Sequence, residues 1–240
     1  MPCLLLRMGA PLQSWGILSP FSIRDSGREP SKSGVLGLLA AALGRSRHES
    51  LEDLASLSMG VRVDREGIPL RDFHTIGGGQ SLGRDYGVYK ASGDPGETAI
   101  STRWYLQDAL FLVALQTDDR NFLEKLEKAI SRPVYPLFLG RRSCPPTFPL
   151  FLGISEKGIE QLLREYPLLD QRASDKQPQR RLVLECSADE GTPRMDVPVS
   201  FDPLHRKYRT RYVKNVFCSP PLQQTEKSEG KEGEACSFPG

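Results

Sequence analysis

The chain has 240 residues, 38% hydrophobic residues and a formal net charge of +2, values typical of a globular protein with one large or two small domains. Lys and Arg number 32 and Asp and Glu number 30, which excludes a binder that is basic over its whole surface but not a local basic groove. Five cysteines without a Cys-x-x-Cys pair, and three histidines, predict free thiols and no metal site.

The N-terminal stretch MPCLLLRMG is too short for a signal peptide, and residues 3–8 within it are typical of a buried strand. The longest apolar run, residues 35–43, is far below the ~20 residues that cross a bilayer. We therefore expect a cytoplasmic protein that does not bind a membrane.

Residues 30–44, PSKSGVLGLLAAALG, predict a buried helix that Ser31 or Ser33 caps and Gly44 ends. The free N–H groups and the dipole at the start of such a helix attract an anion, and Lys32 would strengthen that attraction. An ordinary cap beside a solvated lysine is the alternative, and this feature alone favours the alternative.

The elements of the first half follow a recognisable order. Their predicted positions are a short helix near 50–57, strands at 61–63 and 70–76, one long strand at 103–117, a helix at 121–130 capped by Asn121, and a further strand near Leu137. With the first strand and helix, this is the β-α-β-β-α-β order of ferredoxin-like and RRM-like folds.

Residues 77–102 interrupt this order, with seven glycines and no apolar periodicity. A loop of this length inside a compact domain is usually functional or disordered. Its basic and aromatic residues Arg84, Tyr86, Tyr89 and Lys90 suit contacts to a nucleic-acid backbone and stacking with bases.

A second loop, residues 138–153, has the sequence FLGRRSCPPTFPLFLG. Gly140 permits close approach of the backbone and the prolines stiffen the exit, so Arg141 and Arg142 lie on a pre-organised turn. The spacing alone leaves a structural turn and a phosphate clamp nearly equal.

The second half predicts a helix near 156–166 and strands at 181–186, 197–201 and 208–217. Residues 206–214 contain five basic residues and no acidic ones. This run is either an edge strand protected by its charges or a strip that follows phosphates, and the two interpretations are balanced.

Four motifs together resemble a known family: PLQSWG (11–16), PSKSGVLGLLAAALG (30–44), RDFHT (71–75) and LGRRSCPP (139–146). As an ordered set they are similar to the CasD (Cas-five) family, a subunit of type I-E CRISPR Cascade complexes in the RAMP superfamily. The likeness is dense from Leu4 to Gly153 and becomes thin toward Phe217.

This resemblance implies an α+β fold. An RRM-like or ferredoxin-like palm would occupy residues 1–150 and carry a long thumb hairpin at about 77–102. A smaller β-rich part would follow at 151–221. The resemblance does not extend to residues 222–240, whose polar composition without periodicity by itself predicts a disordered tail.

The resemblance also implies a non-catalytic RNA-binding subunit for antiviral defence, without cofactor or metal. It would bind the 5′ handle of CRISPR RNA, cap the filament of backbone subunits and contact the large PAM-reading subunit, so that target DNA is met only through the complex. The motifs carry the RNA-binding role onto Ser31, Lys32, Ser33, Arg71, His74, Gly140, Arg141, Arg142, Ser143 and Cys144, with Arg84, Tyr86 and Lys90 added from the thumb.

Two other functions remain open at this point. A metal-independent endoribonuclease could process precursor RNA with His74 as general acid or base beside the loop residues Tyr86, Tyr89 and Lys90. An RRM-like protein-interaction module would explain the fold without nucleic acid, although it leaves the arginine loop and the basic run without a joint purpose.

Overall fold

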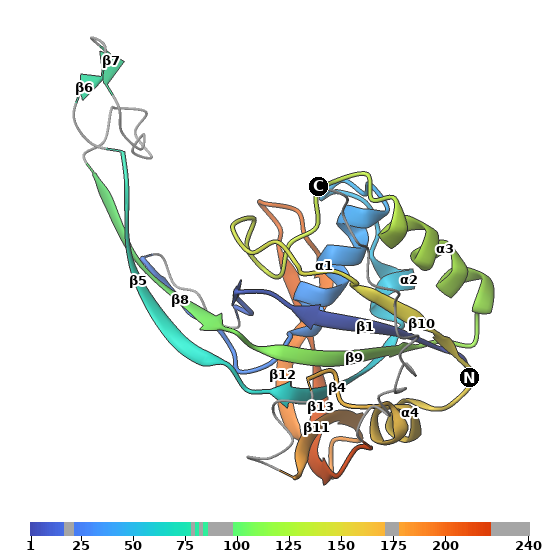
Figure 1. The fold of residues 1–240 in the computed structure, drawn as a ribbon. Helices are drawn as coiled ribbons and strands as arrows, with labels where there is room; N and C mark the ends of the chain where they lie inside the picture. Colours follow the sequence, from blue (N-terminus) through green and yellow to red (C-terminus); the bar gives the residue numbers. More distant parts are fainter. Residues whose placement is uncertain (17–21, 78–79, 82–83, 86–97, 171–177, 222–240) are drawn as a thin grey trace, which may run out of the picture.

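The computed structural model describes residues 1–16, 22–77, 80–81, 84–85, 98–170 and 178–221, with side chains in all of these except 80–81 and 84–85. Tyr86, Tyr89, Lys90 and the expected tail therefore lie outside the described residues. The body is a seven-stranded sheet in the order β10-β1-β9-β4-β11-β13-β12, in which every neighbouring pair is antiparallel (Figure 1). Its strands are β1 (Cys3–Gly9), β4 (Ser58–Arg65), β9 (Leu110–Gln116), β10 (Phe151–Ser155), β11 (Arg180–Cys186), β12 (Thr192–Ser200) and β13 (Lys207–Cys218).

Helices cover both faces of this sheet because its central strands are apolar on both sides. In β1, Leu4, Leu6 and Met8 join the larger core, to which α1 (Lys32–Ala42), α2 (Glu52–Ala55) and α3 (Arg120–Ser131) also contribute. Cys3 and Leu5 point to the other face and pack with the residues of α4 (Ile159–Glu165). Alternation along one strand thus assigns each helix to its face.

The predicted first helix is confirmed, including its ends. Ser31 caps α1 by accepting a hydrogen bond from the backbone N–H of Gly34 at 3.3 Å, and Gly44 follows the helix with a φ of +76°. The predicted cap of α3 is wrong by two residues: Asp119, not Asn121, accepts the hydrogen bond from the N–H of Phe122 at 3.0 Å.

The single long strand predicted at 103–117 is wrong. The chain forms β8 (Ala99–Gln107) and β9, which belong to different sheets and are separated at Asp108, whose φ is +54°. Because both strands are rich in apolar residues, the periodicity of the sequence does not reveal the change of sheet.

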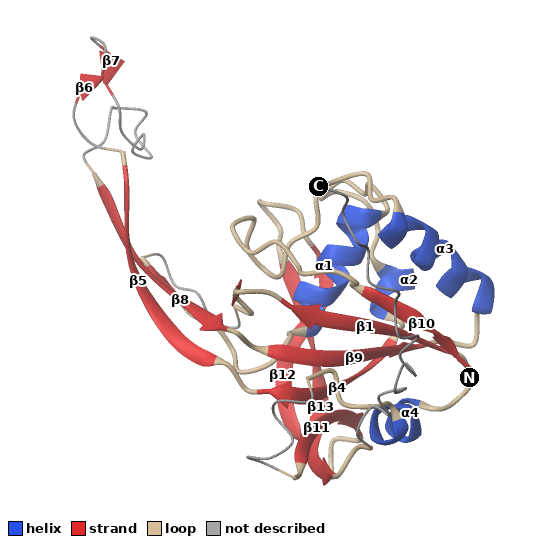
Figure 2. Cartoon of the chain, viewed as in Figure 1, coloured by secondary structure: helices blue, strands red, loops and turns tan. Residues whose placement is uncertain are grey.

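A long hairpin, here called the arm, is formed by β5 (Ile68–Ile76) and β8, which pair in continuous register from Ile68↔Gln107 to Ile76↔Ala99. Figures 1 and 2 show it projecting from the body, with β6 (Gln80–Ser81) and β7 (Arg84–Asp85) at its far end. At the arm's base, β8 also pairs with β2 (Leu12–Gln13) and with β3 (Ile23–Arg24).

The strand predicted near Leu137 is also wrong. Residues 132–150 contain five prolines and form no helix or strand, because each proline lacks the N–H that a sheet ladder needs. The segment instead packs on the end of α1, where the N–H groups of Val134 and Tyr135 donate to the carbonyls of Ala42 and Ala41. The chain returns to the sheet only at β10.

The strands predicted in the second half are present as β11, β12 and β13, and the expected helix is α4. These strands extend the sheet of the first half, since β11 pairs with β4 from Arg181↔Val63 to Leu184↔Gly60. Across the described ranges, no helix combines the length and the hydropathy that a membrane span requires.

Candidate nucleic-acid interface

A groove of about 570 Å³ lies where the base of the arm, the start of α1 and the strands β12 and β13 meet. Four arginines from four separate parts of the chain line it: Arg24, Arg103, Arg141 and Arg206. Its volume is in the range of ligand sites. Its lining has four arginines against two aspartates, Asp25 and Asp196, an excess of positive charge in a chain that is nearly neutral.

Arg24 and Arg103 are register partners on the parallel pair β3–β8, so two guanidinium groups start from neighbouring positions on one face. Like charges directly opposite each other on a sheet destabilise it. Arg103 donates to the hydroxyl of Ser101 at 3.1 Å, and its register partner on the other strand of the arm is Asp72, which lies 3.5 Å from His74. Within the described part of the chain neither arginine forms an ion pair with Asp72 or with another acid. An anion between them would remove the repulsion.

Arg141 connects the elements that form the groove. Its guanidinium donates to the carbonyl oxygens of Trp104 at 3.2 Å, Arg24 at 3.1 Å and Asp25 at 3.4 Å, and it lies over the ring of Tyr105 at 4.6 Å from the centroid. Because these contacts use several of its five N–H groups, Arg141 joins the base of the arm to β3 and to its own loop.

The other residues of the arginine loop differ in whether they line the groove, are exposed or are buried. Gly140 lines the groove with a φ of +87°, and a Cβ there would lie 1.6 Å from the carbonyl oxygen of Ser14, so only glycine fits. Arg142 and Ser143 are exposed. Cys144 is buried at 1% exposure, and burial raises the pKa of its thiol, so it belongs to the core and not to a binding surface.

The predicted anion site at the start of α1 is wrong with respect to Lys32. Ser31 and Ser33 line the groove, but Lys32 is only 4% exposed and its Nζ lies 3.0 Å from a carboxylate oxygen of Glu185. The helix N-terminus does hold an anion, because the N–H of Lys32 donates to Asp196 at 2.8 Å. The bound anion is therefore an internal carboxylate, and the alternative of a solvated lysine is wrong as well; burial lowers the pKa of Lys32.

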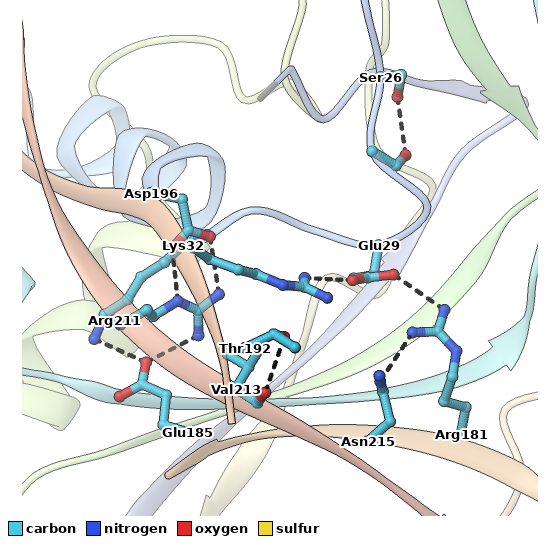
Figure 3. Close-up of polar contacts among 12 residues, drawn as sticks. Ser26, Glu29, Lys32, Arg181, Glu185, Thr192, Asp196, Arg211, Val213 and Asn215 are labelled. Atoms are coloured by element: carbon cyan, nitrogen blue, oxygen red, sulfur yellow. Dashed lines mark hydrogen bonds and ion pairs between the residues drawn. The ribbon is translucent and has the colours of Figure 1, made fainter. Parts of the chain in front are cut away.

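A buried ion-pair network continues from this contact, as Figure 3 shows. Arg211 holds Asp196 with two hydrogen bonds, of 2.7 and 2.9 Å, and reaches Glu185 at 3.0 Å. Beside it, Glu29 binds Arg181 at 3.0 Å and also pairs with Arg194. The network thus fastens the segment before α1 to all three C-terminal strands.

The basic run at 206–214 forms neither a charged edge strand nor a strip that follows phosphates. Its strand, β13, lies between β11 and β12 in the sheet. Arg211 is buried in the network, and Lys214 pairs with Glu190 at 2.6 Å. Arg206, just before β13, is the member of the run that lines the groove. Alternation along a strand sends neighbouring charges to different environments, so the run forms no continuous strip.

Arg71 and His74 lie on the arm and do not line the groove. Arg71 is the register partner of Trp104 and His74 that of Ser101, so the two side chains belong to opposite faces of the hairpin. His74 lies 3.5 Å from Asp72. For Arg84 the structure describes only the backbone, in β7.

Sequence reasoning missed Arg24 and Arg103 and treated Arg206 only as part of the basic run. The density of basic residues at 206–214 is the sequence feature that could have indicated Arg206. No local signal marks Arg24 and Arg103, because their proximity arises from the pairing of β3 with a strand almost 80 positions further along the chain.

The comparisons with known proteins agree with this architecture. A model of the family described as CRISPR-associated protein (Cas_Cas5) matches residues 3–214. The chain belongs to this family. The Cas5 chain is 42% identical over 171 residues to the CRISPR system Cascade subunit CasD of Escherichia coli (strain K12), an alignment that covers 66% of this chain and 73% of that protein.

Solved structures resemble this Cas5 chain over nearly its whole length. A chain of a CRISPR RNA-guided surveillance complex superposes with a TM-score of 0.78 at 35% identity and covers 91% of both chains. The crystal structure of a Cas protein gives a TM-score of 0.69 at 35% identity, covering 92% of this chain and 98% of the other. The mixed α/β fold with antiparallel sheets is thus a Cas5 fold.

We expect Gly140→Ala to destabilise the chain by at least about 1–3 kcal/mol, because the new Cβ overlaps Ser14 and the positive φ is strained. Urea unfolding followed by circular dichroism measures the effect. Gly158→Ala is the matched control, since its φ is −64° and the nearest atom to a new Cβ is 4.0 Å away. Equal midpoints for the two variants would show that the loop yields to the side chain.

We expect Asp196→Ala to cost about 3–5 kcal/mol of stability, because it leaves Arg211 buried without its closest partner. The free energy of unfolding in urea measures this loss. Glu190→Ala removes the acid of an exposed pair with Lys214 and should leave the midpoint nearly unchanged. A small loss in Asp196→Ala would mean that water replaces the carboxylate.

Proposed function

We propose that this Cas5 chain is a subunit of a CRISPR Cascade complex and that its groove holds the 5′ handle of CRISPR RNA. The observation that carries the proposal is the cross-strand pair of Arg24 and Arg103, which lines the groove. Among the described residues neither arginine forms an ion pair, although Asp72 is the register partner of Arg103 on the arm. A phosphate between two guanidinium groups would make charge-assisted hydrogen bonds to both. The relatives named above, a Cascade subunit and a chain of an RNA-guided complex, support the same ligand.

Other lining residues suit the same ligand. The hydroxyls of Ser31 and Ser33 can donate to phosphate oxygens, and Arg206 adds a further cation. Gly140 lets the chain turn closely past Ser14, so no side chain intrudes at that point. We retain Arg142, Ser143, Arg71 and His74 as proposed contacts outside the groove lining, together with Arg84, Tyr86 and Lys90, and we omit the buried Lys32 and Cys144.

The fold supports the assignment of a palm and a thumb. The strands β1, β4, β9 and β10 are the first to fourth strands of this unit in chain order. In space they lie in the order β10-β1-β9-β4, that is, fourth, first, third and second, with α1 and α3 on one face. This is the arrangement of a ferredoxin-like unit. We propose that this unit is the palm and that the arm, Ile68 to Gln107, is the thumb, which is longer than the 77–102 expected from the sequence. Because β10 is one of its strands, we propose that the palm ends at residue 155 and not at the expected residue 150.

Partners follow from this assignment. We propose that the chain caps the backbone filament and contacts the large PAM-reading subunit, while target DNA is met only through the complex. The arm exposes Ile68, Phe73 and Ile100, at 65%, 65% and 54%, and exposed apolar residues on a projecting hairpin suit contacts with other subunits.

A triple variant tests the groove. Arg24→Gln, Arg103→Gln and Arg206→Gln together should weaken binding of single-stranded handle RNA by at least about tenfold for each arginine–phosphate hydrogen bond removed, since such bonds contribute about 1.5–3 kcal/mol. The slope of log K against log salt should also flatten by about 0.7 for each phosphate no longer neutralised. Fluorescence anisotropy across salt concentrations measures both quantities.

The matched control removes three charges elsewhere on the surface. Arg120→Gln, Lys157→Gln and Lys214→Gln change the net charge equally, and their side chains pair with acids away from the groove. Equal weakening by both triple variants would mean that only net charge matters. A flat salt response in the unmodified chain would favour the protein-interaction module.

We propose further that the subunit does not cleave RNA. The cations in the groove are arginines, which do not act as general bases at neutral pH, and His74 lies on the arm beside Asp72. Incubation of the full chain with repeat RNA in the absence of metal should therefore leave the RNA intact on a denaturing gel. Site-specific cleavage that disappears in His74→Ala would establish the endoribonuclease instead.

A further inference from the structure

The lining of the groove differs in chemistry from one side to the other. The side formed by β3 and β8 presents Arg24 and Arg103. The side formed by β12, β13 and the segment between them presents Met195, Phe201 and Tyr208, with Arg206 next to them. Single-stranded RNA has the same two-sided chemistry, with charged phosphates along one edge and flat bases along the other.

Two of these apolar side chains are exposed, although they lie beside a well-packed core. Met195 is 66% exposed and Tyr208 is 37% exposed. Met195 is the register partner of Thr210, and Tyr208 lies two positions before Thr210, so both side chains project from the same face of β12–β13. Phe201 differs, because it packs toward α1 with its ring 3.7 Å from the Cβ position of Gly37. Met195 and Tyr208 therefore form the open apolar surface of the groove, called here the Tyr208 surface.

The ion-pair network holds the Tyr208 surface in place. The ladder between β12 and β13 shifts register between Met195 and Val197, and Asp196 lies at this irregularity. The side chain of Asp196 turns inward to Arg211 and to the N–H of Lys32, both shown in Figure 3, while Met195 faces the groove. Because these contacts fix the surface before a ligand binds, binding does not carry the entropic cost of ordering it.

We infer that one unstacked base of the bound RNA stacks on Tyr208, with Met195 against its edge, while the neighbouring phosphates lie at Arg24 and Arg103. This inference rests on the proposed function and adds the C-terminal strands to the RNA-binding site. Every base has a π-face, so stacking here contributes affinity with little dependence on base identity. It also orients the strand, because the two sides of the groove accept different parts of a nucleotide.

The experiment combines substitutions in the full chain with single abasic nucleotides in the RNA. Tyr208→Ala should weaken binding of handle RNA by about five- to a hundred-fold, the usual effect of removing one stacked base. The salt slope should stay unchanged, because every phosphate keeps its cation. Tyr208→Phe should bind within about twofold of the unmodified chain, since the aromatic ring remains.

One abasic position in the handle RNA should reproduce the weakening seen in Tyr208→Ala. Combining that abasic RNA with Tyr208→Ala should weaken binding no further, because both changes remove the same interaction. Tyr135→Ala is the matched control: Tyr135 is 50% exposed and lies outside the groove lining, so binding should not change.

Three results would overturn the inference: unchanged affinity in Tyr208→Ala, a weakening that adds to that of every abasic position, or a Tyr208→Ala variant impaired only in assembly with other subunits. The last would show that a protein covers the Tyr208 surface. The triple arginine variant separates this failure from failure of the proposed function, because it tests phosphate binding alone. Unfolding midpoints of the tyrosine variants confirm that the fold is retained.

Discussion

The contact between Asp196 and the start of α1 is the interaction on which the groove depends. The helix offers unpaired N–H groups there, and Asp196 on β12 supplies the negative charge that they attract. Arg211 and Glu185 then neutralise the buried charges, since an ion buried alone would be costly. One side of the groove is therefore held against α1, and Ser31 and Ser33 are brought to its edge.

The same pairing explains how a nearly neutral chain presents a basic groove. Outside the groove many cations are neutralised, for example Arg45 by Asp53, Arg62 by Asp64 and Lys157 by Glu165. Two acids line the groove beside its four arginines: Asp196, which is held by Arg211, and Asp25. The positive potential is thus local, and a local potential attracts a polyanion to one place on the surface. Net charge alone conceals such a site.

Arg141 and Gly140 show that one loop both stabilises the fold and lines the groove. Arg141 donates its hydrogen bonds to the carbonyls of Trp104, Arg24 and Asp25, which holds β3 beside the arm. Gly140 allows the approach to Ser14 on which this contact depends. The loop proposed from the sequence as a phosphate clamp therefore acts first as the support that places Arg24 and Arg103, and only then as part of the lining.

The sequence by itself determined what depends on neighbours in the chain: the capped helix α1, the strands β1, β4 and β11, the unusual loop at Gly140, and the motifs that mark the Cas5 family. These follow from periodicity, capping and turn chemistry, which act over a few residues. Only the tertiary structure decided that residues 103–117 are divided between two sheets, that Lys32 is buried, and that Arg24 meets Arg103. Strand pairing and burial join residues that are distant in the chain, so a charged residue's role as an internal partner or a ligand contact is settled by which strand lies beside it.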